Sequence, residues 1–507
     1  MRAATFLFVL LLVASPVRAM DRQDVGLSAR GQLIQALVVR AASESAPVVL
    51  LVGGMGDDAR SSRAVTDAVM AFDKQPPARR RFTLIGIAFA NPDDQTRLVF
   101  PPTGAAYRDN PEAHALWRWI GAQAPDLVLI AGDGDAGLAA ALAEHAAADV
   151  GRIPARRWVG AADLAALVTI PRSEASLEIE RRRARSPRQV AQELALRYGR
   201  DFDQPWYIGA IALIGRLRLG DLDDVRRLVE PYVDGTKDSL ERANSLVLAG
   251  HIVFTELARR TDDPRYAAAV RKVADLGFEA DGRMKEAIPY HNEFSDSVFM
   301  GTAIVAQAGT LTGDRKYFDM ADRHLKFMQN LDLRPDGLYR HQPATDAAWG
   351  RGNGFAALGL ALALAELPRD HAGYAHALQS YRSHIAALLP YQNRDGLWRN
   401  VIDHPGAYAE LSATAMIGWA MLRGLDAGWL DGRDYERAVD RAWLAVSSRT
   451  SPSGGFIDVC ESTARMTSLE QYLRRAAILG EDPRAGAMVL LFATELMATR
   501  DGARSGR

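Results

Sequence analysis

The sequence predicts a mainly α fold, an (α/α)6 toroid preceded by a smaller α/β domain. From about residue 28 to residue 172, short apolar runs alternate with helical stretches, which is typical of a parallel sheet between helices. After about residue 187 apolar residues recur at i, i+3, i+4 and i+7, so amphipathic helices follow one another without a strand pattern. These helices also carry a weak repeat, since Thr261–Tyr266 and Thr312–Tyr317 each place an acidic N-cap before a helix.

The α/β domain is expected over residues 20–172. Three apolar runs predict buried strands, and two stretches between them predict helices; the strands are expected at 46–52, 82–88 and 126–130, and the helices around 61–72 and 112–122. Strands that are separated by helices indicate a parallel sheet covered on both faces.

The helical domain is expected over residues 186–500. Turn signals followed by an aromatic residue, at Pro335–Tyr339 and Arg394–Trp398, lie between helix pairs. About twelve helices in pairs are typical of a closed toroid, whereas an open helical solenoid is the alternative that the same repeat allows.

The two ends of the α/β domain have distinct compositions. Residues 1–19 have the form of a signal peptide, with Arg2, an apolar run over 6–13 and a small-x-small site at 17–19. A membrane anchor is the alternative, but the run is far shorter than the roughly 20 residues of a span. We therefore expect a periplasmic or secreted protein. The charged stretch 173–185, which contains Arg181–Arg183, is expected to be a solvated linker.

The composition restricts the partners. The net charge is −1, which argues against a nucleic-acid partner, and no later segment predicts a membrane span once the signal peptide is cleaved. A single cysteine, Cys460, excludes an internal disulfide and a thiolate metal cluster. We expect no cofactor and no metal, and the sequence does not predict the oligomeric state.

Asp296 is the first candidate for chemistry. It begins an apolar helix and lies between Phe294 and Phe299. One interpretation is a helix N-cap, because an Asp side chain in this position accepts a backbone N–H. The other is a carboxyl group in an aromatic pocket, where desolvation raises the pKa and keeps a proton available.

A second group of polar and aromatic residues follows within a short stretch. His341 comes after a turn, and Trp349, Arg351 and Phe355 surround the Gly-rich start of another helix. A guanidinium group at such a helix start can hold a carboxylate bidentately. Gly-x-Gly-x-Gly without a preceding strand or a lysine is a weak phosphate signal.

From Trp206 to Leu496 the chain resembles the unsaturated rhamnogalacturonyl hydrolases and the unsaturated glucuronyl hydrolases, glycoside hydrolase families 105 and 88. The resemblance is carried, in the family's order, by Asp296–Gly301, Trp349–Phe355, Gly396–Asp403, Tyr408–Met416 and Ala485–Leu491. It implies an (α/α)6 enzyme that removes a 4,5-unsaturated uronic acid from the non-reducing end of lyase-generated oligosaccharides. The implied reaction is vinyl-ether hydration: an acid protonates C4, water adds at C5, and the hemiketal opens to release the aglycone.

The resemblance also implies roles for individual residues. Asp296 matches the general acid and base, and His341 and Arg351 match substrate-binding positions. Trp349 and Phe355 match aromatic positions of the cleft, although the family more often has Trp where Phe355 stands. Trp398, in another matching stretch, is expected to bind substrate as well.

One departure concerns a second acid. The family typically has an Asp in an earlier helix, where this chain has Ser245. Asp238, Glu241 or Glu293 could replace it. Without a replacement, activity is reduced, the substrate differs, or the chain is a non-catalytic carbohydrate-binding protein.

The α/β domain faintly resembles zinc carboxypeptidase-like domains through Val49–Asp57, Ala90–Asp93 and Phe100–Pro102. Those domains place a His and a Glu after the Gly-Gly of the strand as metal ligands, but Met55–Asp58 contains no histidine. We therefore expect a degenerate, non-catalytic domain. A hydrolase activity that resides in this domain is the alternative.

Overall fold

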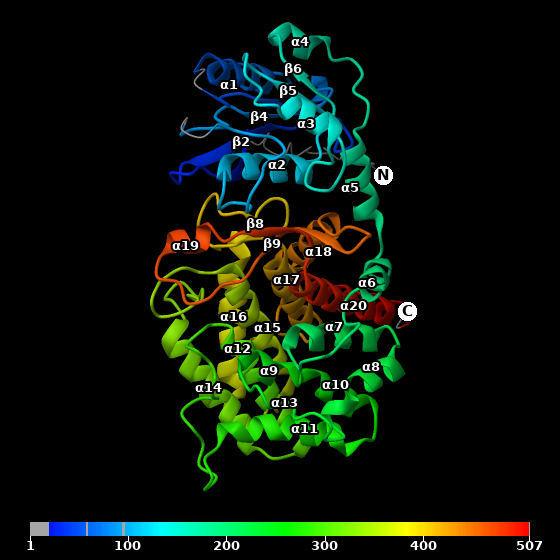
Figure 1. The fold of residues 1–507 in the computed structure, drawn as a ribbon, viewed down its shortest axis with the longest axis vertical. Helices are drawn as coiled ribbons and strands as arrows, with labels where there is room; N and C mark the ends of the chain where they lie inside the picture. The colour runs from blue at the N-terminus through cyan, green and yellow to red at the C-terminus, as the bar shows by residue number, and fades with distance from the viewer. Residues whose placement is uncertain (1–19, 57–58, 94–96, 506–507) are drawn as a thin grey trace, which may run out of the picture.

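A computed structural model describes residues 20–56, 59–93 and 97–505. The signal peptide predicted for residues 1–19 lies outside the described residues, as do residues 57–58 of the loop compared with zinc enzymes. Figure 1 shows two units stacked along the long axis, the α/β domain at one end and the helical domain below it. No helix in the described ranges is long and apolar enough to span a membrane.

The α/β domain contains a six-stranded sheet in the order β1-β2-β4-β3-β5-β6. The strands are β1 (Asp21–Leu27), β2 (Leu33–Val39), β3 (Val48–Val52), β4 (Thr83–Ile87), β5 (Leu127–Ile130) and β6 (Ala155–Arg157). The four strands β4, β3, β5 and β6 pair in parallel, and the hairpin β1–β2 adds to β4 in antiparallel fashion. The three predicted strands are confirmed as β3, β4 and β5. The other three were missed because their residues are only partly buried, so their apolar runs are broken.

Helices cover both faces of this sheet, as predicted. Helices α1 (Ala59–Asp73) and α4 (Ala161–Ala166) share one apolar cluster with the sheet, and α2 (Pro111–Gln123) and α3 (Leu138–Glu144) share a second cluster on the other face. A short 3-10 helix, η1 (Pro77–Arg79), leads into β4.

The segment predicted as a solvated linker is a helix, α5 (Glu174–Ala184). Ser173 caps it by accepting a hydrogen bond from the Ser176 N–H, and α5 packs against α2 and α18. Arg182 is 3% exposed, and its Nε donates to Glu178 of the same helix at 2.8 Å. The arginine run is therefore not wholly solvated, and the Arg182 carbonyl accepts from Ser447 Oγ of the helical domain at 2.6 Å.

The helical domain is a closed toroid, which confirms the predicted architecture over the open solenoid. The inner helices contact one another in the order α7, α10, α13, α15, α17, α20 and back to α7. Each has an outer partner, in the same order α8, α11, α14, α16, α18 and α6. The bounds are α6 (Pro187–Ala195), α7 (Tyr207–Arg218), α8 (Leu222–Val229), α9 (Ser245–Gly250), α10 (Ile252–Arg260), α11 (Pro264–Ala274), α12 (Ser297–Met300), α13 (Thr302–Thr312), α14 (Lys316–Asp332), α15 (Gly350–Glu366), α16 (Tyr374–Leu388), α17 (Leu411–Asp426), α18 (Arg433–Ser448) and α20 (Pro483–Ser505), with 3-10 helices η2 (Glu230–Tyr232), η3 (Asp275–Gly277) and η4 (Leu389–Tyr391).

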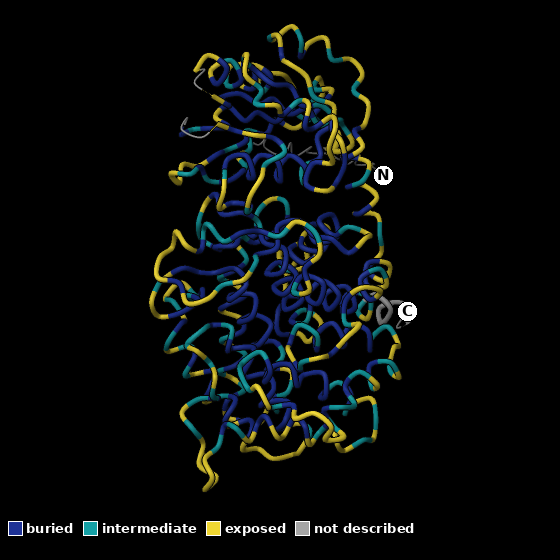
Figure 2. The backbone as a smooth tube through the Cα atoms, viewed as in Figure 1, coloured by how far each residue is buried: buried dark blue, intermediate teal, exposed yellow. Residues whose placement is uncertain are grey.

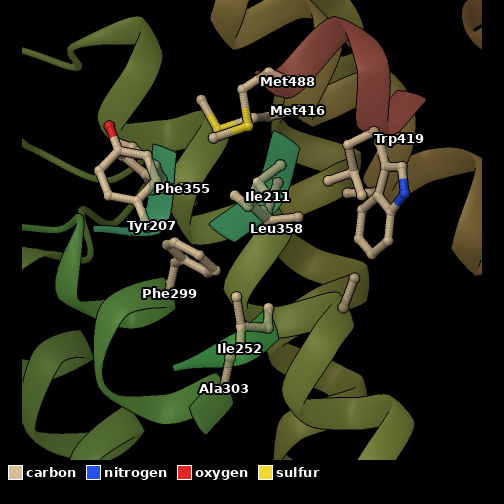
Figure 3. Close-up of a cluster of buried hydrophobic side chains, with 14 of the residues drawn as sticks. Tyr207, Ile211, Ile252, Phe299, Ala303, Phe355, Leu358, Met416, Trp419 and Met488 are labelled. Carbon is tan, nitrogen blue, oxygen red and sulfur yellow. The ribbon is translucent and has the colours of Figure 1, made fainter. Parts of the chain in front are cut away.

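The inner helices enclose the main hydrophobic core. Figure 2 shows them as an almost continuous buried region, with exposed backbone concentrated in the connecting loops. Figure 3 shows its centre, where aromatic and aliphatic side chains from successive inner helices meet. Helix α15 is buried on nearly all sides, which its apolar sequence after Gly350 explains.

The expectation of no strands after about residue 187 is wrong. Two short strands, β7 (Trp398–Arg399) and β8 (Ala409–Glu410), form one small pair, and β9 (Gly455–Cys460) and β10 (Ala477–Glu481) form another. All residues of β9 are buried. β9 contains Asp458 among apolar residues, and a short, wholly buried run of this kind cannot be distinguished from a buried helical segment by its period.

The two units share one hydrophobic core. Trp349, Tyr408 and Tyr472 of the helical domain belong to the same buried cluster as the residues of α2. Tyr107 of the α/β domain stacks on Tyr408, with ring centroids 4.5 Å apart and an interplanar angle of 10°. The α/β domain is thus fixed against the rim of the toroid that carries β9 (Figure 1).

Candidate active site

Asp296 directly precedes the short helix α12. Its backbone is helical, with φ −52° and ψ −29°, and its carbonyl accepts hydrogen bonds from the Phe299 and Met300 N–H groups. The side chain makes no capping hydrogen bond. The N-cap interpretation of this carboxyl group is therefore wrong, and the side chain is available for another role.

The loop before Asp296 holds an unusual backbone conformation. Tyr290, Asn292 and Glu293 have φ values of 66°, 53° and 58°. Residues with a Cβ adopt this left-handed region at a cost, and such residues are concentrated at functional sites. The loop thereby positions Phe294 and Asp296 against the residues that follow β9.

The Asp296 carboxyl group lies in a largely desolvated position. Its side chain is 18% exposed. Burial raises its pKa to about 7, and the positive charge of Arg351 opposes the shift only in part. Near neutral pH this carboxyl group can therefore both donate and accept a proton, as the aromatic-pocket interpretation predicts.

His341 faces Asp296. Its Nε2 is 3.7 Å from Asp296 Oδ1, and its Nδ1 hydrogen-bonds with the Tyr472 hydroxyl group at 2.7 Å. The imidazole ring stacks on Phe294 at a centroid distance of 4.5 Å. Burial lowers the pKa of His341 to about 3, with a further contribution from the charge of Arg465, so the ring is neutral at physiological pH.

Several buried polar atoms near this pair have no hydrogen-bond partner among the described residues. They are Ser295 Oγ, Asp296 Oδ1, His341 Nε2 and Trp349 Nε1. Three of these side chains surround Gly352, where an added Cβ would lie 2.7 Å from Ser295 Oγ, 3.3 Å from Trp349 Cε3 and 3.6 Å from Asp296 Oδ1. Buried polar groups are normally paired. These four unpartnered atoms are therefore suited to bind the hydroxyl groups of a polar ligand.

Arg351 is held by atoms of the protein. Its Nε donates to Ser412 Oγ at 3.0 Å, another guanidinium nitrogen donates to the Cys460 carbonyl, and Glu410 lies at 3.7 Å. The guanidinium group also lies over the Trp349 ring, 5.4 Å from its centroid. Only 2% of Arg351 is exposed, so in this conformation its guanidinium group is held by the protein and lies against Trp349. Binding of a substrate carboxylate by Arg351 stays a prediction.

An Arg351→Lys variant tests which role is correct. Lysine keeps the charge but lacks the planar fork, so we expect the free energy of unfolding to fall by about 1–3 kcal/mol. Urea denaturation measures this, with Arg437→Lys, whose side chain is 69% exposed, as a matched control that should change it by less than about 0.5 kcal/mol. Unchanged stability together with a raised KM would instead show that Arg351 contacts the substrate.

The structure does not bring Phe355 and Trp398 to the residues around Asp296. Phe355 is 1% exposed and packs in the toroid core, stacked on Phe299 and edge-on to Tyr207 (Figure 3). Trp398 is 0% exposed, and its indole N–H donates to the Leu388 carbonyl at 2.8 Å. Neither ring offers a surface to a sugar in this conformation, because both point into the core. Trp349, also buried, differs in that its indole N–H has no hydrogen-bond partner among the residues that the structure describes.

Sequence reasoning missed the segment between β9 and β10, which carries the short helix α19 (Leu469–Leu473) and lies below the α/β domain (Figure 1). Tyr472 contributes the hydroxyl group bound to His341, and its carbonyl accepts from Asn400 Nδ2 at 2.8 Å. Arg465 donates to the Asn292 carbonyl at 3.1 Å and lies over Phe294, 5.7 Å from the centroid. These residues are far from Asp296 in the sequence, and no local pattern predicts their approach.

None of the proposed substitutes for the second acid is buried beside Asp296. Asp238 pairs with Lys272 at 2.6 Å at the surface, Glu241 is exposed, and Glu293 pairs with Arg465 at 3.4 Å. Ser245 begins α9, which packs against α12. Within the described ranges, no group of three or more His, Cys, Asp and Glu side chains could hold a metal ion.

Comparison with known proteins decides the family. The profile of Glycosyl Hydrolase Family 88 matches residues 222–499, more than half of the chain. The chain belongs to this family. All of the predicted site residues lie within the matched range.

The individual relatives share limited sequence identity with this chain. An unsaturated rhamnogalacturonyl hydrolase of Bacillus subtilis is 26% identical over 247 residues, which cover 45% of this chain and 69% of that protein. An unsaturated 3S-rhamnoglycuronyl hydrolase of Formosa agariphila is 35% identical over 101 residues, 20% of this chain and 27% of that protein. The similarity to the second protein thus covers only a small part of its length.

Solved structures support the fold. A possible member of glycoside hydrolase family 105 from Salmonella enterica aligns with a TM-score of 0.53 at 19% identity, covering 62% of this chain and 94% of that chain. A glycosyl hydrolase family 88 protein from Bacteroides vulgatus aligns with a TM-score of 0.51 at 14% identity, covering 62% and 99%. Each alignment covers nearly all of the solved structure but only part of this chain.

Proposed function

We propose that the protein removes a 4,5-unsaturated uronic acid from the non-reducing end of lyase-generated oligosaccharides by vinyl-ether hydration. The observation that carries this proposal is Asp296, whose pKa of about 7 and buried, unpartnered Oδ1 equip it to donate a proton. Family membership, and the names of relatives that act on unsaturated rhamnogalacturonyl and rhamnoglycuronyl compounds, support the same substrate class.

Asp296 acts in both proton transfers. Its carboxyl group protonates C4, and the electron pair of the C4=C5 bond forms the new C–H bond while the ring oxygen stabilises the cation at C5. Water then adds at C5 and returns a proton to the Asp296 carboxylate, after which the hemiketal opens and the aglycone leaves as an alcohol. One carboxyl group with a pKa near the working pH suffices for this sequence.

The neighbouring groups orient the sugar and the water. Neutral His341 offers Nε2, which is 3.7 Å from Asp296 Oδ1, to a water molecule or a hydroxyl group. The Trp349 indole N–H is a donor, and the Ser295 hydroxyl group can donate or accept. All three are fixed by packing, and a rigid arrangement reduces the entropy lost on reaching the transition state.

A panel of lyase-generated oligosaccharides tests the proposal through loss of the absorbance of the C=C–carboxylate chromophore. We expect turnover of at least one unsaturated member and none of its saturated counterparts. Tight binding of unsaturated oligosaccharides without any loss of absorbance would favour a carbohydrate-binding protein, the alternative that Ser245 motivates. Export to the periplasm or the medium is also proposed, from residues 1–19.

The pH dependence of activity has a defined sign. Because the pKa of Asp296 is raised to about 7, the proton needed at C4 is held below that pH and lost above it. We expect kcat/KM to fall by about tenfold per pH unit above this pKa, since only the acid form is active. A profile measured at constant ionic strength checks this, and a rate that still rises above about pH 8 would contradict the assignment.

A further inference from the structure

Asp332, the last residue of α14, has an exceptional environment. The residue is 0% exposed, and neither carboxylate oxygen has a hydrogen-bond partner among the described residues. An ionised carboxylate in such a position loses its hydration without compensation. The neutral, protonated form is therefore strongly favoured, and burial raises the pKa of Asp332 to about 8.

Asp332 lies next to the candidate active site. Its backbone carbonyl accepts from the Arg340 N–H at 2.9 Å, and Arg340 directly precedes His341. The titratable and charged groups that face Asp332 are Arg340, which lowers its pKa, Asp296 and Glu293, which raise it, and the hydroxyl groups of Tyr339 and Tyr472.

Arg340 does not neutralise Asp332 by a direct ion pair. Its Nη1 bonds Asp346 at 2.9 Å, and its buried Nε has no partner among the residues described. A charge on Asp332 would thus act on whatever lies beside Asp296 with little screening by solvent.

We propose that Asp332 gates the acidic sugar by its charge: when protonated it admits the anionic sugar beside Asp296, and when ionised it repels that sugar. This rests on the proposed function, because the carboxylate of the uronic acid supplies the opposing charge. Asp332 is a positioning residue, since it acts through its charge and does not touch the reacting atoms.

Direct binding measurements separate this role from the ionisation of Asp296. The background is the Asp296→Asn variant, in which the catalytic group cannot titrate, and the probe is the unsaturated disaccharide released by a uronate-specific lyase. We expect its Kd to rise by about tenfold between pH 6 and pH 9, the size of a like-charge interaction between groups that are close but not in direct contact. In Asp296→Asn/Asp332→Asn the Kd should stay constant over the same range.

The methyl ester of the same disaccharide is the matched ligand, and its Kd should not vary with pH in either variant. A pH-dependent Kd that persists in the double variant, or one that is also seen with the ester, would overturn the gate. Absence of binding at pH 6 in every variant would instead overturn the proposed function. Circular dichroism checks that each variant is folded. Asp296→Asn/Asp332→Glu restores an acid at this position and should recover the pH dependence.

Discussion

Replacing Asp296 by asparagine is expected to lower turnover at least a hundredfold while the fold and substrate binding persist. The amide preserves the size of the side chain, but it cannot donate the proton that C4 requires or accept the one from water. General acid–base assistance is typically worth about 10²–10⁴-fold, and here one group serves both proton steps. Loss of chromophore absorbance measures the rate.

The same substitution has a second signature in stability. In the folded protein the pKa of Asp296 is raised from 3.8 to about 7. The bound proton therefore stabilises the wild-type protein at low pH, and this stabilisation is lost as the pH rises through about 7. Asparagine does not titrate, so the Tm difference between variant and wild type should move in favour of the variant between pH 5 and pH 8. Asp370→Asn, an exposed carboxylate paired with Arg315 at 3.2 Å, is the control and should change neither rate nor this difference. Wild-type turnover in Asp296→Asn would remove Asp296 from the mechanism.

The fold was predictable where a repeated pattern determines packing. Paired amphipathic helices are the direct result of apolar spacing, and closure of the ring follows once α20 meets α7. The missed strands have a different origin: β9 is short and wholly buried, and β1 depends on pairing with β2 for its identity. Such strands are determined by tertiary partners and not by local propensity.

The candidate site was predictable only in part, for a related reason. Asp296 and His341 were identified because their motifs resemble those of a family, and the structure places them 3.7 Å apart. Phe355 was assigned to the cleft together with Asp296 and His341. It lies one helical turn after Arg351, and its ring faces the core (Figure 3). Tyr472 and Asp332 were missed, because a long-range approach and an unpaired buried oxygen leave no signature in the sequence.

The contact between the two units yields the second large expected effect. Asp458 in β9 is 4% exposed and binds Arg118 of α2 at 2.5 Å, Arg449 at 3.2 Å and the Tyr107 hydroxyl group at 3.2 Å. Arg118 and Arg449 are themselves 3% and 7% exposed. One carboxylate therefore compensates two guanidinium groups that have little access to water.

Asp458→Asn is expected to lower the free energy of unfolding by about 3–5 kcal/mol, because breaking a buried ion pair leaves the remaining charges uncompensated. Asparagine is the appropriate replacement, since Asp458 has a φ of 61° and Asn tolerates the left-handed region better than other residues with a Cβ. Urea unfolding measures the change, with Asp434→Asn, from an exposed pair with Arg437, expected to stay within about 1 kcal/mol. Because Asp458 also joins the α/β domain to the strand that leads into the Tyr472 segment, turnover should fall together with stability. A loss below about 1 kcal/mol in Asp458→Asn would mean that water enters the contact and that this ion network does not hold the two units together.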